Sequence, residues 1–377
     1  MIYFDNAATT QVCPEAAQAA MRAMTELYGN PSSGHVLGRR AKEELKNARA
    51  QIAKDIGAAK PTEIVFTSCG SESDNWALIS GAEKNRRAGR HIISSLVEHD
   101  AVLKTLDRLE HDGWEVTRLS PEPDGSISVE KVARALRPDT ALVSLMMVNN
   151  QTGAVTDIAG IAKAIKAAGS PALLHTDAVQ GYMKVPFSAR SLGADMISVS
   201  GHKIHAPKGI GALYIRDGLN LAPMILGGGQ EEGRRSGTEP MPQICAFAAA
   251  SAAAAAAMPE ALTRMAQIRQ HVINRVTDEI PDSVVIGGGA GHILCISLPG
   301  YRSEVLLNFL DSRGICISRG SACKRGRRSH VLTAMNLSPR VIDGAIRISF
   351  SRGSTLDEAD TFCDELALAA KNLFTAL

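Results

Sequence analysis

Residues 173–214 read LLHTDAVQGYMKVPFSARSLGADMISVSGHKIHAPKGIGALY, and this stretch decides the expected fold. Two short apolar runs, at 172–175 and 195–200, are each flanked by turn-forming residues and predict buried strands of a parallel sheet. In open α/β sheets, ligands bind beyond the carboxyl ends of such strands. The residues expected at this crevice are Asp177, Gln180, Ser200, Gly201, His202 and Lys203, which include an acid, an amide, an imidazole and an amine.

An acid and an amine at one crevice are the groups that pyridoxal 5'-phosphate (PLP) needs. A lysine holds this cofactor as a Schiff base, and an acid keeps its ring nitrogen protonated, so that the ring withdraws electrons from the substrate. Taken alone, Asp177 is better explained as a helix cap and Lys203 as a surface lysine. Their ordered combination with Ser200, Gly201 and His202 favours a PLP site.

The composition argues against several other classes of function. The chain has 377 residues, enough for a large and a smaller domain, and 45% of them are hydrophobic. A net charge of +2 and an aromatic content of 4% disfavour nucleic-acid binding. We expect no signal peptide in the opening MIYFDNAATT and no apolar run long enough to cross a membrane. The Ala-rich run at 246–257 is expected to be a packed helix.

Seven cysteines are scattered along the chain without a CxxC pair. This pattern disfavours a disulfide framework and a zinc site, so we expect no metal and a reducing cytoplasm. Cys323 stands among Gly, Ser and several cations in the segment 318–330. Nearby positive charge lowers the pKa of a thiol, which favours a loop nucleophile; the alternative is an exposed cysteine beside a solvated charge run. Cys295 and Cys316 lie in apolar runs and are expected to pack.

Predicted strands and helices alternate up to about residue 215, which indicates a mostly parallel sheet with helical cover. The turn at 68–73 leads from a strand into a helix and has phosphate-binding geometry, although many such turns bind nothing. A separate polar helix at 262–279 is expected to join a second, α+β domain. The predicted division is a large PLP-binding domain of residues 15–257 and a small domain of residues 1–14 and 258–377.

A series of motifs runs along essentially the whole chain in a characteristic order. They are DNAATT near the start, GNPSSGH, EHDAV, VNNQTG, HTDAVQ, SGHKIHAPKGIGALY, RSGTEP, GSAC and IRISFSRG. In this order the chain resembles the NifS/IscS-type cysteine desulfurases, which are class V aminotransferase-like PLP enzymes of fold type I. The resemblance implies a large α/β domain, with a mostly parallel seven-stranded sheet covered by helices, and a smaller α+β domain.

The resemblance also implies a role for each matching residue. Lys203 would hold the cofactor and move the Cα proton, and His99 would stack on the ring and act in acid–base steps. The other implied cofactor contacts are Asp177 at the ring nitrogen, Gln180 and Asn150 near the ring oxygen, and Gly70, Ser71, Ser200 and His202 at the phosphate. Thr238 of a neighbouring subunit would complete the phosphate site, which implies a homodimer. Arg347 would bind the substrate carboxylate, with Asn30 nearby.

The implied activity is a sulfurtransferase reaction (EC 2.8.1.7) in which L-cysteine gives L-alanine and a persulfide on Cys323. The sulfur would pass to an acceptor protein, such as an iron–sulfur scaffold or a tRNA-thiolation protein. The alternatives are a selenocysteine lyase or another class V PLP aminotransferase or lyase, and a protein of this fold that only binds a partner.

The chain departs from the family pattern at a few positions. Cys69 stands where the family usually has glycine, so strain is expected if the backbone there needs a positive φ. Ser71 replaces the more usual threonine and keeps its hydroxyl. The segment at 324–328, KRGRR, is more basic than in IscS-type members, which bears on the identity of the sulfur acceptor.

Overall fold

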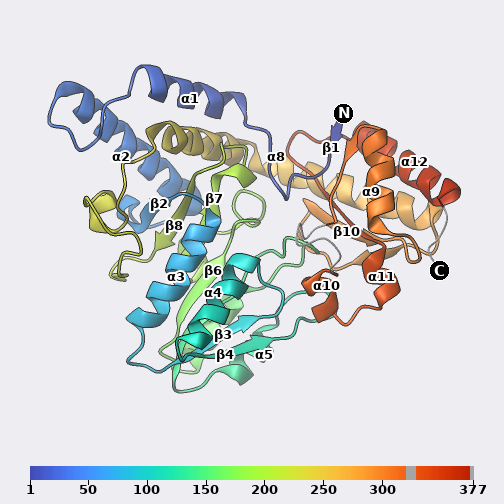
Figure 1. Ribbon diagram of the computed structural model, residues 1–377, viewed down its shortest axis with the longest axis horizontal. Coiled ribbons are helices and arrows are strands. Elements are labelled where there is room, and N and C mark those ends of the chain that lie inside the picture. Colours follow the sequence, from blue (N-terminus) through green and yellow to red (C-terminus); the bar gives the residue numbers. More distant parts are fainter. Residues whose placement is uncertain (320–327, 374–377) are drawn as a thin grey trace.

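The computed structural model describes residues 1–319 and 328–373 (Figure 1). Their α-helices are α1 (Pro14–Thr25), α2 (Val36–Ile56), α3 (Gly70–Lys84), α4 (Asp100–His111), α5 (Val129–Ala135), α6 (Ile158–Ala167), α7 (Ala189–Leu192), α8 (Met241–Glu279), α9 (Ser303–Ser312), α10 (His330–Ala334), α11 (Pro339–Asp343) and α12 (Leu356–Asn372). Their 3-10 helices are η1 (Pro61–Glu63), η2 (Gly201–Lys203) and η3 (Glu231–Gly233). Their strands are β1 (Ile2–Tyr3), β2 (Ile64–Thr67), β3 (His91–Ser95), β4 (Glu115–Leu119), β5 (Thr140–Ser144), β6 (Leu173–Asp177), β7 (Met196–Ser200), β8 (Gly211–Ile215), β9 (Val284–Ile286), β10 (Ile293–Ser297), β11 (Ile315–Cys316) and β12 (Ala345–Ser349).

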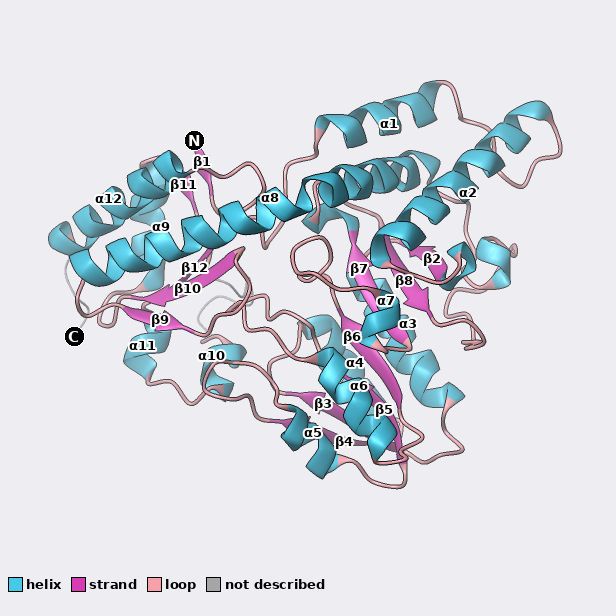
Figure 2. Ribbon diagram, turned by 180° about the vertical axis from the view of Figure 1, so that it is seen from behind, coloured by secondary structure: helices cyan, strands magenta, loops and turns pink. Residues whose placement is uncertain are grey.

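Within the described residues, a seven-stranded sheet forms the centre of the larger part of the molecule. Its strand order is β2-β8-β7-β6-β5-β3-β4. The strands from β7 to β4 run parallel, whereas β8 is antiparallel to both β2 and β7. Helices cover both faces, with α3 and α4 in front in Figure 1 and α6 and α7 in front in Figure 2. This arrangement confirms the expected α/β fold with a mostly parallel sheet, and it explains why β5 and β7 are buried along their whole length.

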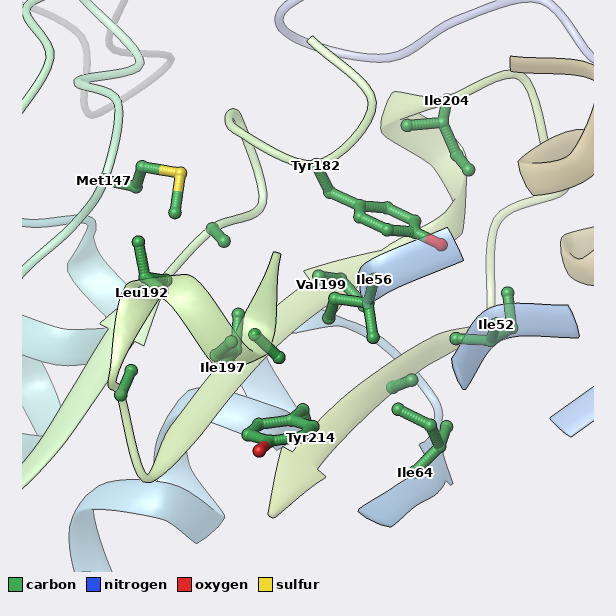
Figure 3. Close-up of a cluster of buried hydrophobic side chains, with 14 of the residues drawn as sticks. Ile52, Ile56, Ile64, Met147, Tyr182, Leu192, Ile197, Val199, Ile204 and Tyr214 are labelled. Carbon is green, nitrogen blue, oxygen red and sulfur yellow. The ribbon is translucent and has the colours of Figure 1, made fainter. Parts of the chain in front are cut away.

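One face of this sheet packs against α2 through a single apolar stripe of the helix. This stripe, which recurs with the 3.6-residue period of a helix and includes Leu45, Ala48, Ile52 and Ile56, is buried. Figure 3 shows Ile52 and Ile56 beside side chains of the strands, among them Val199 of β7. The sheet and its helices therefore hold the carboxyl end of β7 in a fixed place.

A second core belongs to the smaller part of the molecule. There, β12, β10 and β9 form an antiparallel sheet, and β1 pairs in parallel with β11. Phe4 lies at the centre of this core, with its ring centroid 5.1 Å from that of Phe350 and 6.0 Å from that of Phe362. The start of the chain is therefore packed against its end. This α+β part agrees with the second domain expected from the sequence.

The helix α8 runs through both parts of the molecule (Figure 2). The sequence predicted an Ala-rich helix and a separate polar helix at 262–279, but one 39-residue helix includes both and contains Pro259. Buried residues on each side of the proline, such as Ala254 and Met265, belong to α8, so tertiary packing outweighs the local cost of the proline. The predicted domain boundary at 257/258 lies inside this helix, and the division stays a prediction.

The same helix corrects the expectation that no apolar run could cross a membrane. By length and composition, α8 is long and apolar enough to do so. Half of its most apolar window is buried inside the protein, and its N-terminal half packs against α1 and α2. We therefore interpret α8 as a core helix that packs in both parts of the molecule and connects them.

Candidate active site

A cavity of about 400 Å³ lies beyond the carboxyl ends of β6 and β7. Among the residues singled out in the sequence, those that line it are Gly70, Ser71, His99, Asn150, Asp177, Gln180, Ser200, His202, Lys203 and Arg347. They come from the ends of β6 and β7 and the segments after them, from the loop after β5, from the amino ends of α3 and α4, and from β12. The fold thus gathers one amine, several acids and amides, three imidazoles and a guanidinium around one space.

Lys203 is the last residue of η2, directly after β7. Its Nζ donates hydrogen bonds to the carbonyl oxygens of Ala7 (2.7 Å) and Ala8 (2.6 Å), so the N-terminal segment holds the amine in the cavity. Burial, together with the nearby charge of Arg347, lowers the pKa of Lys203 to about 8. About a tenth of this amine is therefore unprotonated at pH 7, far more than for an ordinary lysine, and the unprotonated form is the nucleophile.

Two neighbouring carboxyl groups, those of Asp177 and Asp74, line the same cavity. Asp177 ends β6 and accepts a hydrogen bond from the backbone N–H of Val179 (2.9 Å), whereas Asp74 projects from α3. Burial raises the pKa of both groups, and Asp177 raises that of Asp74 further, well above its ordinary value. The nearby His99, the N–H of Val179 and the charge of Lys203 oppose the rise in the pKa of Asp177. Asp177 is therefore the acid that stays ionised more readily and can pair with a cationic ring nitrogen.

The amino end of α3 forms an anion-binding corner of the cavity. The helix begins at Gly70, where a Cβ would lie 2.7 Å from Cγ2 of Val179, so only glycine lets the helix start so close to this loop. The hydroxyl of Ser200 is buried, and among the described residues it has no hydrogen-bond partner. An unpartnered hydroxyl beside the free N–H groups of a helix terminus suits a phosphate.

Cys69 caps this helix without the strain that the family's usual glycine suggested. Its φ is −173°, an extended conformation open to any residue, so no positive φ is required. The thiol lines the cavity beside Gly70 and Ser71.

The remaining groups around the cavity are fixed by hydrogen bonds. Nδ1 of His99 accepts from the backbone N–H of Ala101 (3.1 Å), which leaves Nε2 as the protonated nitrogen of the neutral ring. Nδ1 of His202 lies 3.2 Å from Oγ1 of Thr9, and burial lowers the pKa of His202 to about 4. Gln180 donates from Nε2 to the carbonyl oxygen of Ala7 (2.8 Å).

Arg347 reaches the cavity from β12 and is buried. Its Nη2 donates to Oδ1 of Asp5 (2.7 Å) and to Oγ of Ser318 (3.3 Å), and its Nη1 donates to the carbonyl oxygen of Asn150 (2.8 Å). Asp5 therefore orients the guanidinium and balances its charge. A guanidinium held in this way can receive a ligand carboxylate at the cavity wall.

Two of the predicted residues that the structure describes, Asn30 and Thr238, are not brought to this cavity. Asn30 is exposed in the loop between α1 and α2 and uses its side-chain oxygen to accept from the N–H of Ser32. Thr238 is exposed just before α8. Neither is among the residues that line the space. Cys323 lies outside the described residues, as does the basic segment 324–327.

The structure adds residues that the sequence did not single out. Asp5, Asp74 and His330 line the cavity, and Nε2 of His330 lies 3.0 Å from the carbonyl oxygen of Glu98. Asp5 belongs to the DNAATT motif and Glu98 to EHDAV, so the motifs were recognised without a role for these positions. Asp74 lies one helical turn after Gly70 in α3. This spacing of four residues places both on the same face of the helix, and it could have identified Asp74 from the sequence.

The aminotransferase class-V family model matches residues 2–362. The chain belongs to this family. A cysteine desulfurase from Trichormus azollae is 41% identical over 365 residues, which cover 96% of this chain and 90% of the relative. A solved NifS-like protein superposes with a TM-score of 0.93 at 36% identity, covering 99% of this chain and 100% of the other. The structure of SspA in complex with cysteine has a TM-score of 0.82 at 34% identity, covering 94% and 100%.

The similarity to the class-V family covers both parts of the chain that form the cavity. The relatives named cysteine desulfurase match nearly the full length of this chain. The match to the family model, at residues 2–362, includes both Asp5 and Arg347. The similarity thus extends to both sides of the cavity, the side with Lys203 and the side with Arg347.

Proposed function

We propose that this class-V protein is a PLP-dependent cysteine desulfurase that converts L-cysteine to L-alanine and passes on the sulfur. The observation that carries the proposal is the placement of the amine of Lys203 and the carboxylate of Asp177 on one cavity that also has an anion-binding corner. The names of the relatives support the choice of substrate, since they are cysteine desulfurases over nearly the whole chain.

The described residues fit PLP at three separate points. The first turn of α3 and the unpartnered hydroxyl of Ser200 suit its phosphate, Asp177 suits its ring nitrogen, and Lys203 suits its aldehyde. When bound, PLP supplies an electron sink that stabilises negative charge at the Cα of an amino acid. His99, which offers a protonated Nε2, is placed to lie against the ring.

The substrate's carboxylate is assigned to Arg347. Its guanidinium is held by Asp5 and by the carbonyl of Asn150, so it is oriented before a ligand arrives. Binding the carboxylate there fixes the Cα of the substrate between Arg347 and Lys203. The amine of Lys203, with its pKa lowered to about 8, then takes the Cα proton and later returns one.

Cys323 is proposed as the sulfur acceptor on sequence grounds alone, since it lies outside the described residues. Its thiolate would attack the sulfur of the substrate, and a sulfur–sulfur bond would form. The bond between Cβ and sulfur of the substrate would break, and Cβ would then be protonated. The net change is one thiol and one L-cysteine giving one persulfide and one L-alanine, so no external oxidant or reductant is needed. An acceptor protein of iron–sulfur assembly or tRNA thiolation would then receive the sulfur.

A homodimer and a cytoplasmic location complete the proposal. Exposed apolar side chains near the α1–α2 loop and near Thr238, such as Met21, Tyr28 and Leu226, support a further protein contact. In such a dimer, Thr238 of the partner subunit would reach the phosphate corner. The cytoplasmic location rests on the sequence, in which seven scattered cysteines without a CxxC pair favour a reducing compartment.

The proposal is tested with purified protein, PLP, L-cysteine and a thiol reductant. We expect equal amounts of alanine and sulfide, and we expect Cys323→Ala to bind PLP normally but to lose sulfide release. Absence of alanine from the wild-type protein would refute the desulfurase. Faster alanine formation from selenocysteine than from cysteine would favour a selenocysteine lyase, and a keto acid product would favour an aminotransferase.

A further inference from the structure

Lys184 is a buried amine next to the proposed cofactor site that none of the steps above uses. It follows β6 by seven residues, and only 8% of it is exposed. In the part of the chain that the structure describes, Lys184 forms no ion pair. The charged groups that affect its pKa are two further cations, Lys203 and Arg347. Burial and these two cations lower the pKa of Lys184 to about 7. A lone buried amine is costly to a fold, so a purely packing role would be better filled by methionine.

The polar contact of Lys184 is the side-chain amide of Gln180. Nζ of Lys184 donates to Oε1 of Gln180 at 3.4 Å. On its other side, the same amide donates from Nε2 to the carbonyl oxygen of Ala7 at 2.8 Å. Gln180 is 5% exposed and lines the 400 Å³ cavity, whereas Lys184 lies behind it.

These two contacts permit a single orientation of the amide. If the amide turned over, its oxygen would face the carbonyl oxygen of Ala7, and its N–H groups would face the protonated amine of Lys184, in a buried place where an unmade hydrogen bond is expensive. Lys184 and Ala7 together therefore distinguish the two orientations, and neither contact alone would fix the amide as firmly.

The backbone between the two residues holds this contact in place. Residues 178–185 form consecutive turns in which the carbonyl of Ala178 accepts from the N–H of Gly181 and of Tyr182. Tyr182 points into the core, as Figure 3 shows, and its hydroxyl lies 2.6 Å from that of Ser251. Met183 adopts a φ of 58°, which is uncommon for a residue with a side chain, and this bend returns the chain so that Lys184 lies behind Gln180.

We propose that Lys184 is a positioning residue that fixes the amide of Gln180 with an N–H group, rather than its oxygen, available to the bound cofactor. The amide has two N–H groups, and Ala7 takes one of them. The other is then available to an acceptor in the cavity, such as the ring oxygen of PLP. This inference rests on the proposed function, since PLP is the ligand that Gln180 would contact.

The inference is tested by the dissociation constant of PLP from the apo-protein, measured for wild type, Lys184→Met, Gln180→Ala and the double variant. We expect each single variant to weaken PLP about tenfold, as the loss of one buried hydrogen bond does, and the double variant to be no weaker than Gln180→Ala. The melting temperature of apo Lys184→Met should not fall, because the variant removes a buried charge. The matched control is Lys166→Met, an exposed lysine of α6, which should leave PLP affinity unchanged.

Three results would overturn the inference. They are wild-type affinity in Lys184→Met, losses that multiply in the double variant, or a fall in apo stability that accompanies the loss of affinity. Gln180→Glu supplies a test that leaves Lys184 in place: it puts an acceptor where the donor should be, so it should weaken PLP more than Gln180→Ala does. Affinity equal to wild type in Gln180→Glu would also overturn it. Failure of the wild-type protein to bind PLP at all would instead count against the proposed function.

Discussion

The two walls of the cavity are built in different ways. On one wall, Asp177, Ser200 and Lys203 come from adjacent parallel strands and lie 26 positions apart at most, between 177 and 203. On the other, Arg347 is oriented by Asp5, 342 positions away, through the pairing of the chain's start with its end. In the proposed function, the first wall would hold the cofactor and the second would bind the substrate carboxylate. A substitution in the second wall should therefore change how the substrate carboxylate is bound and leave the groups of the first wall unchanged.

The largest effect should follow from a change to the first wall. Lys203→Ala removes both the group that holds the cofactor and the base at Cα, so we expect kcat to fall by about 10³-fold or more. The visible absorption band of the bound cofactor should disappear at the same time, while the apo-protein keeps its fold. An absorption spectrum identical to wild type would place the cofactor on another lysine and remove the basis of the comparison.

A change to the second wall should affect substrate binding and spare the cofactor. Arg347→Lys keeps the charge but loses the planar pair of donors, so we expect KM for L-cysteine to rise about 10–100-fold. The cofactor spectrum should match that of wild type. Steady-state kinetics and absorption spectra of the same samples test this prediction. An unchanged KM, or loss of the cofactor, would mean that substrate binding and cofactor binding are not separated between the two walls.

The pH dependence of cofactor capture sharpens the account of the first wall. Because the pKa of Lys203 is lowered to about 8, its unprotonated fraction falls tenfold for each pH unit below 8 and is nearly constant above 9. The rate at which apo-protein takes up PLP should therefore be about tenfold slower at pH 7 than at its plateau. Stopped-flow absorbance measures this rate. A rate that still climbs tenfold between pH 9 and 10 would indicate an ordinary lysine.

The smallest effect is expected at Cys69. Its backbone is extended, so Cys69→Gly relieves no strain and only adds conformational freedom to the unfolded chain. The free energy of unfolding of the apo-protein should fall by about 0.5–1 kcal/mol. Denaturant titration of the two proteins decides the point, and a clear stabilisation by glycine would show that the cysteine is strained.

The first wall could be predicted almost completely from the sequence. The apolar runs before Asp177 and Lys203 are strands, and parallel strands bring their carboxyl ends to one edge, so adjacency in the sheet follows from local pattern. The limits of the strands were slightly off: Asp177 closes β6 where the sequence suggested that it follows the strand. Such boundaries depend on hydrogen bonds to neighbouring strands that the local sequence does not contain.

The second wall and the supports behind the first could not be predicted in the same way. The pairing of Asp5 with Arg347 depends on β1 joining β11 and on the order of strands in a separate sheet, which are long-range choices. Lys184 was passed over because its burial results from the left-handed turn at Met183, and nothing in the local residues marks that turn. The continuous α8 was missed for a related reason, since the proline in its middle is outweighed by packing on either side.

The central claim is that Lys203, and no other amine in the cavity, holds the cofactor. Reduction of the PLP-loaded protein with borohydride followed by peptide mapping tests it directly, because reduction makes the lysine–cofactor linkage permanent. The account predicts a phosphopyridoxyl group on Lys203 in nearly all modified chains. The same group on the neighbouring buried Lys184, with Lys203 unmodified, would contradict it.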